Sequence, residues 1–504
     1  MKKSDVIIVG TGIAGLSLAL HLIEKNKALK IVLLAKGYPC ATNTSLAQGG
    51  LAVVCDRLID SYEEHIQDTL AAGQGKCNPE IVEMVIKQAP QRLQELIKWG
   101  AEFDADREGK LDLALEGGHS HERVVHYKDK TGWHIQEVLW NKIKSHPSIE
   151  IIDNALAVDI IKENIYNTER AVGLTFFDRN NQFSAVYAPH IVLATGGSGH
   201  IFNYTSNPEN ATGDGVAMAL RAGVSVKDMQ YVQFHPTALF EKKKGNLFLI
   251  SEALRGFGAH VVNYREERFL YHYDVRGELA TRDIVSKAIA TEMIISNEEN
   301  VFLDLRHLNN KGFEIHFPTI FSNLKEKGFD YKIDLIPIVP AAHYQCGGIE
   351  VNENGQTSLK NLYALGECSC TGLHGANRLA SNSLIEALVF SHNVAEVIAH
   401  DENNDVLYYE HSHNHKPEFI APTILKDFNL QVKNWMTFSL LTNSFESKQI
   451  VLSNLHKIHS DLMECLGYYN RCKECCELEN MLDVAMLILE HSCHYQGIES
   501  EQFA

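Results

Sequence analysis

The chain has 504 residues, of which 45% are hydrophobic and 22% charged, and these fractions are those of a folded globular protein rather than a disordered one. Its formal net charge of −18 argues against a nucleic-acid partner, because phosphate contacts require clustered Lys and Arg. The 11 cysteines are an odd number, which favours free thiols in the cytoplasm over a disulfide framework.

The length predicts roughly three domains of about 150 residues each. Lys2 and Lys3 precede an apolar run, as in a secretion signal, but this run carries a glycine motif and continues into a polar helix, so export is not expected. No apolar stretch approaches the about 20 residues that span a bilayer, so we expect no membrane partner.

The N-terminal segment has the pattern of a dinucleotide-binding turn. An apolar strand over residues 5–9 leads into Gly10-Thr11-Gly12-Ile13-Ala14-Gly15, and a helix is predicted over 16–24. The first glycine permits a tight turn, the second lets a pyrophosphate approach the backbone, and the third allows close helix packing. The helix N-terminus favours the negative charge. The alternative is a plain strand-to-helix corner.

A second strand is predicted over residues 31–35. A nicotinamide-binding unit usually ends this strand with an acid that holds the ribose, but Ala35, Lys36 and Gly37 stand here, which weakens an NAD assignment. The small polar segment 43–50 suits a loop that wraps backbone amides around a cofactor, although an ordinary surface loop is the alternative. Helical spacing covers residues 61–70 and 78–98, the second with Asn78 as N-cap.

Further strands are predicted over residues 149–161, 171–177 and 190–194. The last is apolar and ends in Thr195-Gly196-Gly197, a feature of flavin-binding folds where the chain passes close to the cofactor. Another strand and turn, 361–367, ends in Glu367, which we expect to replace the missing ribose acid. These elements are far apart, so a domain is inserted between 223 and about 342. It contains helical runs around Leu254 and over 282–295.

The residues after about 417 are predicted to be helical, with apolar faces over 433–441, 450–466 and 478–490. Cysteines 465, 472, 475 and 476 lie in this part. One pair has the two-residue gap of a zinc site, and the segment looks helical, so we expect no metal. His411, His413 and His415 lie in a polar linker and are expected to be solvated.

Polar clusters occur in loops or at the ends of predicted elements. They cover residues 116–121, 233–237, 251–256, 281–283, 340–344 and 377–378. Each histidine or arginine alone is more often structural than functional. Together, histidines and arginines that converge on one cavity would bind a dicarboxylate, because arginine pairs with a carboxylate through two parallel hydrogen bonds and stays charged.

At these clusters, residues 5 to about 490 resemble the flavoprotein family of succinate dehydrogenase, fumarate reductase and L-aspartate oxidase. The shared motifs cover residues 233–237, 343–348, 362–367 and 374–384. Residues 116–121 resemble the aspartate oxidases in particular, where a glutamate faces the substrate amino group; Thr131-Gly132 and 252–256 agree with this.

The resemblance implies an α/β fold in which an FAD-binding Rossmann-like domain carries an inserted α+β capping domain and a C-terminal helical domain. The expected boundaries are 1–228 and 344–413 for the two parts of the FAD-binding domain, 229–343 for the capping domain and 414–504 for the helical domain.

The resemblance also implies roles for individual residues. His235, His343 and Arg378 would bind the substrate carboxylates, Ser251 would add a hydroxyl contact, Arg282 would transfer the proton, and Glu116 would face the amino group. The residues expected at FAD are Gly10, Thr11, Gly12, Ile13, Ala14, Gly15, Lys36, Asn43, Thr44, Ser45, Leu46, Ala47, Gln48, Gly49, Gly50, Ala157, Val158, Thr195, Gly196, Asp214, Glu367, Ser383 and Leu384. Asn43 stands where the membrane-linked dehydrogenases tether flavin to a histidine, so FAD is expected to be non-covalent.

The leading hypothesis is FAD-dependent oxidation of L-aspartate to iminoaspartate, with O2 or fumarate as electron acceptor. This would be the first step of NAD biosynthesis through quinolinate, with transient contact to quinolinate synthase. A soluble fumarate reductase or succinate dehydrogenase flavoprotein subunit is the alternative, which Asn43 and Glu116 disfavour. A non-catalytic flavin-binding or scaffolding protein is a third hypothesis.

Overall fold

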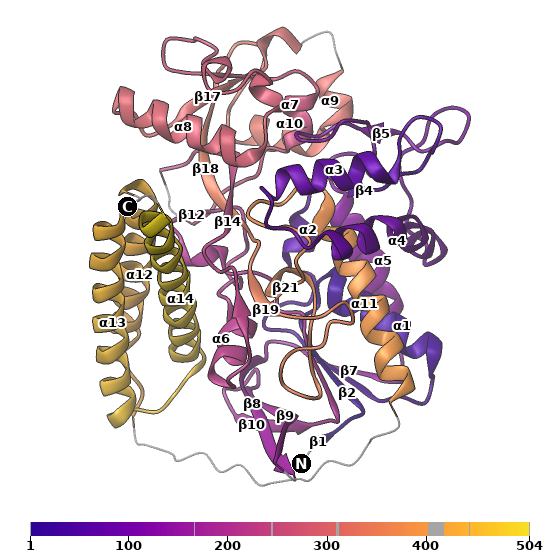
Figure 1. Ribbon diagram of the computed structural model, residues 1–504, viewed down its shortest axis with the longest axis vertical. Coiled ribbons are helices and arrows are strands. Elements are labelled where there is room, and N and C mark those ends of the chain that lie inside the picture. Colours follow the sequence, from indigo (N-terminus) through magenta and orange to yellow (C-terminus); the bar gives the residue numbers. More distant parts are fainter. Residues whose placement is uncertain are drawn as a thin grey trace.

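The computed structural model describes residues 2–165, 167–242, 245–308, 312–401, 418–442 and 444–502 (Figure 1). Its central layer is a five-stranded parallel sheet in the order β20-β11-β2-β3-β7. The strands are β20 (Leu362–Ala364), β11 (His190–Leu193), β2 (Val6–Val9), β3 (Ile31–Leu34) and β7 (Ile149–Ile152). Four of these strands, β20, β11, β2 and β3, are buried throughout, because helices and loops cover both faces of a parallel sheet.

Helices α1 (Ile13–Lys25), α4 (Pro79–Lys98), α5 (Thr131–Ile143) and α11 (Asn382–His400) pack together beside this sheet. The helix expected over 78–98 is α4, and Asn78 caps it through a bond from Glu80 N. The helix expected over 61–70 is α3 (Tyr62–Ala72), which Ser61 caps in the same way. Short elements between these helices are α2 (Asn43–Leu46), β4 (Leu51–Ala52), β5 (Leu113–Ala114) and β6 (Val124–Val125).

The strand expected over 149–161 is wrong in one respect. Residues 149–152 form β7 of the parallel sheet, whereas β8 (Leu156–Ile165) pairs antiparallel with β9 (Thr168–Phe177) in a second sheet. Asn154 separates them with a φ of 50°, a left-handed conformation that ends the extended run. The second sheet also contains β10 (Phe183–Tyr187) and β1 (Lys2–Lys3).

A third sheet and a second hydrophobic core form the part at the top of Figure 1. The core residues come from the segment between Leu239 and Ile338. Strand β14 (Val232–Leu239) pairs with β18 (Ile336–Gln345), which also pairs with β12 (Tyr204–Thr205) and β17 (Val301–Asp304). The sheet ends in β15 (Gly245–Asn246) and β16 (His260–Val262), and the covering helices are α7 (Glu252–Gly256), α8 (Arg282–Ser296), α9 (Phe313–His316) and α10 (Pro318–Glu326).

The last three helices form a bundle at one side of the molecule (Figure 1). They are α12 (Pro422–Thr442), α13 (Phe445–Tyr468) and α14 (Lys473–Gln502), each longer than the apolar run that predicted it. Helix α14 also packs against α6 (Asp214–Arg221). A small sheet of β13 (Val226–Lys227), β19 (Gly348–Glu350) and β21 (Ser369–Cys370) lies nearby.

The expected domain boundaries stay a prediction. Strand β12 pairs with β18 of the inserted sheet, although it precedes residue 229, the expected start of the capping domain. The boundary at 413 and the histidines 411, 413 and 415 lie outside the described residues. Within the part of the chain that the structure describes, no helix combines the length and apolar character needed to cross a membrane.

Candidate active site

One cavity runs from the glycine turn after β2 to residues of the inserted segment such as Ser251 and Arg282. All the residues expected to be catalytic line it: Glu116, His235, Ser251, Arg282, His343 and Arg378. The expected cofactor residues line it too, apart from Gly15, Ser45 and Val158. Residues that were expected to act together, although they come from distant segments, therefore line a single cavity.

The glycine turn lines the cavity and packs closely against the end of β11. Gly10 has a φ of +116°, and a Cβ there would lie 2.0 Å from the Ala194 carbonyl oxygen. Gly196 and Gly366, with φ of 75° and 69°, form the neighbouring turns. These left-handed conformations favour glycine, and their closeness to the N-terminus of α1 gives a cradle for a phosphate-bearing cofactor. FAD fits this end of the cavity.

The three expected residues that do not line the cavity have structural work. A Cβ on Gly15 would lie 2.1 Å from the Gly10 carbonyl oxygen, so this glycine lets α1 pack against the turn. Ser45 closes the capping box of α2 with Thr42. The Val158 side chain is buried in a small apolar cluster, and its carbonyl oxygen accepts a bond from Arg221 Nη2 at 2.8 Å.

The ribose role expected for Glu367 stays a prediction, and the strand order speaks against it. Glu367 follows β20, and strands β11 and β2 separate β20 from β3, after which the ribose acid of a dinucleotide fold would stand. Three strand spacings amount to about 14 Å. Glu367 instead accepts bonds from Asn43 Nδ2 at 2.9 Å and Gln345 N at 3.1 Å. Burial in the cavity wall raises the pKa of Glu367 to about 7.

Lys36 occupies the position after β3 instead. Its Nζ lies 2.8 Å from Asp214 Oδ2 and 2.8 Å from Glu477 Oε1, the latter at the start of α14. Burial lowers the pKa of Lys36, but the two carboxylates outweigh burial and raise it above its usual value. A charged lysine and its carboxylate partners thus form the wall at this end of the cavity.

Two histidines come from paired strands at the other end. His235 lies on β14 and His343 on β18, and their ring centroids are 5.0 Å apart. An irregularity in the pairing of β14 with β18 follows His235. Burial, followed by the charge of Arg282, lowers the pKa of both rings well below the usual range, so both are neutral near pH 7.

Arg378 is fixed by its neighbours in the loop before α11. Its Nη2 donates to His343 Nε2 at 2.9 Å and its Nη1 donates to Ser383 Oγ at 2.6 Å. Its guanidinium lies 4.1 Å from the Tyr344 ring centroid, a favourable cation–π contact. Because His343 Nε2 accepts, its Nδ1 carries the proton and donates to Ser206 Oγ at 2.7 Å.

Arg282, the first residue of α8, belongs to a buried chain of charges. Its Nε donates to Glu252 Oε2 at 2.6 Å, and the other oxygen, Glu252 Oε1, accepts from Arg255 Nη2 at 2.8 Å. Burial raises the pKa of Glu252, but the two arginines outweigh burial and leave it below its usual value. Arg282 Nη1 donates to Gln233 Oε1 at 3.0 Å.

Glu116 is a second buried carboxylate, only 2% exposed. Its Oε2 accepts from Ser381 Oγ at 2.6 Å. A Cβ on Gly49 would lie 2.6 Å from Glu116 Oε1, so this glycine makes room for the carboxylate. Burial and the nearby Glu252 raise the pKa of Glu116, and Arg282 opposes this. Both Glu116 and Glu252 line the cavity, but unlike Glu252, Glu116 forms no ion pair among the described residues.

This end of the cavity can hold a small dianion and an amino group. Arg282 and Arg378 supply fixed positive charge, His235 offers a ring nitrogen, Nε2, that has no partner among the described residues, and Ser251 lines the wall at the start of α7. Glu116 supplies a carboxylate for a cation. The side chains that line this end of the cavity are therefore complementary to an amino dicarboxylate.

Sequence reasoning missed the roles of Glu252, Arg255 and Ser381. The cluster 251–256 was recognised, but nothing in its spacing shows that Glu252 lies between two arginines, one of them 30 residues away. The signal for Glu252 and Arg255 was their separation of three residues, which places both side chains on one face of a helix.

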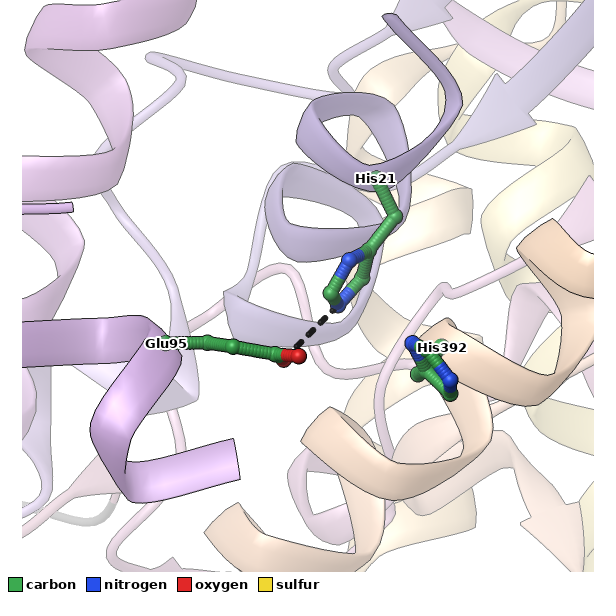
Figure 2. A group of neighbouring side chains, drawn as sticks. All are labelled: His21, Glu95 and His392. Atoms are coloured by element: carbon green, nitrogen blue, oxygen red, sulfur yellow. Dashed lines mark ion pairs between the residues drawn. The ribbon is translucent and has the colours of Figure 1, made fainter. Parts of the chain in front are cut away.

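A histidine cluster lies outside this cavity (Figure 2). His21 on α1, Glu95 on α4 and His392 on α11 each offer a ligand atom, all within 4.8 Å of one another. Arg92 Nη2 already pairs with Glu95 Oε1 at 3.0 Å, and this cation opposes a metal ion. A second group of possible metal ligands consists of Asp60, Glu64 and His121. Asp60 in this group already pairs with Arg123. The expectation of no metal stays a prediction.

Comparison with known proteins agrees with the cavity. Residues 5–384 match the FAD binding domain family. The chain is 44% identical to the L-aspartate oxidase of Vibrio cholerae over 404 residues, covering 79% of this chain and 75% of that protein. It is 39% identical to the L-aspartate oxidase of Acinetobacter baylyi, covering 98% of this chain and 92% of that protein.

Solved structures give the same result for the fold. A mutant of E. coli quinol fumarate reductase superposes with a TM-score of 0.86 at 29% identity, over 97% of this chain and 89% of that one. The α/β fold with its FAD-binding domain, expected from the sequence, is thereby confirmed. The chain belongs to the L-aspartate oxidase family of FAD-binding flavoproteins.

Proposed function

We propose that this chain oxidises L-aspartate to iminoaspartate with FAD, and passes the electrons to O2 or fumarate. The observation that carries this proposal is the single cavity that joins the glycine turn to two buried arginines and a buried glutamate. The reaction would be the first step of NAD biosynthesis through quinolinate, in the cytoplasm, with transient contact to quinolinate synthase.

The carboxylates of aspartate would bind Arg378 and the neutral histidines. Arg378 is already oriented by His343 and Ser383, so little side-chain freedom is lost when a carboxylate arrives. Neutral rings beside the arginines avoid like-charge repulsion. His235 Nε2 is free for a hydrogen bond, whereas His343 would act by holding Arg378 in place. Ser251, buried at the N-terminus of α7, adds a hydroxyl.

The ammonium group would be selected by Glu116. The carboxylate is buried, receives one hydrogen bond from Ser381, and faces the same arginines as the substrate carboxylates. Succinate and fumarate bring no positive charge to offset its burial, whereas aspartate does. Charge-assisted bonds of this kind contribute about 1.5–3 kcal/mol.

The proton would move through Arg282. FAD, when bound, supplies the acceptor for a hydride from the substrate carbon. The bonds from Arg282 to Glu252, and from Arg255 to the same carboxylate, form a continuous buried path.

FAD would be held without a covalent bond. Asn43, at the position of the tethering histidine in the membrane-linked dehydrogenases, donates to Glu367 and has no nucleophilic nitrogen. We expect acid or denaturant to release all the flavin. Fluorescence that stays with the polypeptide after denaturing electrophoresis would contradict this.

An anaerobic bleaching experiment tests the function. The oxidised holoenzyme is mixed with L-aspartate, succinate or buffer, and the visible absorbance of the flavin is followed. We expect rapid bleaching by L-aspartate and little by succinate. Faster bleaching by succinate would instead favour the fumarate reductase or succinate dehydrogenase alternative. The similarity to quinol fumarate reductase supports that alternative.

A further inference from the structure

Two thiols lie against each other at the start of α14. Cys472 Sγ and Cys475 Sγ are 3.0 Å apart. The Cys472 carbonyl oxygen accepts the bond from Cys476 N at 3.1 Å, so Cys472 is the N-cap and Cys475 the third residue of the helix. A Cys-x-x-Cys pair at a helix N-terminus is the arrangement of redox-active dithiols, because the helix end favours a thiolate.

The two sulfurs are close enough to form a disulfide with little movement. The bond with Cys472 lowers the pKa of Cys475, and the same bond raises that of Cys472. A disulfide has an S–S distance of about 2.05 Å, so the sulfurs need to approach by only about 1 Å. Cys472 is 9% exposed and Cys475 is fully buried, so an oxidant would reach the pair when the first turn of α14 opens.

The same helical turns support the wall of the FAD-binding cavity. Glu477 Oε1 lies 2.8 Å from Lys36 Nζ, and Asn480 Nδ2 donates to Asp214 Oδ1 at 2.8 Å. Lys36 and Asp214 line the cavity and pair with each other. The two cysteines therefore lie within two turns of contacts that fix this wall.

We propose that Cys472 and Cys475 form a reversible disulfide that strengthens FAD binding. The S–S bond forms as two S–H bonds and the O–O bond of a peroxide break; the thiols lose two electrons and two protons, and the peroxide leaves as two waters. This inference rests on the family's FAD binding and not on the identity of the substrate.

The direction of the effect follows from the position of the crosslink. The first turn of a helix has few hydrogen bonds of its own and opens easily. A bond between the N-cap and the third residue prevents this opening, so Glu477 and Asn480 stay against Lys36 and Asp214. An apoprotein with an ordered wall loses less freedom when FAD binds.

Peptide mapping of the full-length holoprotein tests the disulfide. The protein is treated with hydrogen peroxide, free thiols are blocked, and trypsin cuts after Arg471 and Lys473. We expect the dipeptide Cys472-Lys473 attached to Cys475 of the C-terminal peptide, and its release by dithiothreitol. A dipeptide that stays unlinked, or that is joined to Cys476 or Cys493, would overturn the assignment.

Titration of the apoprotein with FAD tests the coupling, with flavin fluorescence as the readout. We expect the peroxide-treated form to bind FAD at least about threefold more tightly than the reduced form. Cys475→Ser should abolish the difference, and so should Cys472→Ser, which keeps a good N-cap residue. Cys465→Ser, on the neighbouring helix α13, is the matched control and should keep it. Equal affinities in the wild type, or a difference that survives Cys475→Ser, would refute the proposal.

Discussion

Glu116 and Glu252 show how two buried carboxylates near the same arginine acquire different roles. Glu252 uses both oxygens to bind Arg282 and Arg255, so its charge is neutralised within the protein. Glu116 receives a single hydroxyl bond, from Ser381, and its pKa is raised by burial. A ligand cation would complete the environment of Glu116, whereas Glu252 is already complete.

The first prediction concerns Glu116→Gln, which keeps the shape and removes the charge. We expect kcat/KM for L-aspartate to fall roughly 10- to 150-fold, which corresponds to about 1.5–3 kcal/mol of lost transition-state stabilisation. Fumarate reduction should be nearly unchanged. Steady-state kinetics on both substrates, at matched flavin content, measure this. Equal losses on the two substrates would make Glu116 structural.

The second prediction concerns Arg282→Leu, which removes a positive charge from the cavity and one end of the chain through Glu252. Aspartate oxidation and fumarate reduction should both fall by at least about 10²-fold, the effect of losing acid–base catalysis. Arg276→Leu removes an exposed guanidinium paired with Asp274 and is the matched control. Near wild-type turnover in either direction would exclude the role of Arg282.

The third prediction is a pH dependence that arises from Glu367. Its pKa is raised from 4.5 to about 7, so the unfolded chain holds fewer protons than the folded one between these values. The stability that the protonated carboxyl contributes is therefore complete below pH 4.5 and is lost as the pH rises through 7.

Glu367→Gln removes this titration and can still accept the bond from Gln345 N. The mutant apoprotein should match the wild type in unfolding free energy at low pH and exceed it above pH 7, by at most about 3 kcal/mol. Denaturant unfolding between about pH 5 and about pH 8 measures the difference. Glu122→Gln, an exposed change, serves as control, and parallel curves for wild type and Glu367→Gln would refute the argument.

At the scale of elements, local patterns predicted what local forces decide. The turn from Gly10 to Gly15, the start of a helix near Ser61 and the N-cap Asn78 could be placed because short-range sterics and hydrogen bonds determine them. The position of Glu367 could not, since it depends on the order of strands that are distant in sequence. The break at Asn154 was missed because both flanking segments are apolar.

The fourth prediction tests the packing of α1 against its turn. Gly15→Ala would place a Cβ 2.1 Å from the Gly10 carbonyl oxygen, a backbone atom, so the helix must move away. We expect a lower melting temperature and loss of FAD binding. Gly467→Ala, in α13, meets nothing within 4 Å and should stabilise by up to about 1 kcal/mol. Normal FAD affinity in Gly15→Ala would contradict the prediction.

At the scale of the whole molecule, the cavity is lined by residues from outside and from within the inserted segment. Glu116 and Arg378 come from outside the segment between Leu239 and Ile338 that forms the second core, and Ser251 and Arg282 come from within that segment. No spacing in the sequence could show this convergence, because it depends on the fold of an insert. The family motifs could predict this convergence, since they contain residues that act together in related proteins.

The final prediction follows from this position. Fumarate cannot be reduced by an enzyme with oxidised flavin, so it can bind there without turnover, and its two carboxylates would join Arg378 of one part to the residues of the other. A ligand that binds only the folded state adds stability, about 2.7 kcal/mol at 100 times its dissociation constant. The melting temperature of the oxidised holoenzyme should therefore rise with fumarate concentration. Arg378→Met should lose most of this rise, because Arg378 is 6% exposed and lines the cavity, whereas Arg179→Met, at an exposed pair with Asp153, should keep it. Equal rises in both variants would mean that fumarate binds elsewhere, and that the two cores are not joined through Arg378.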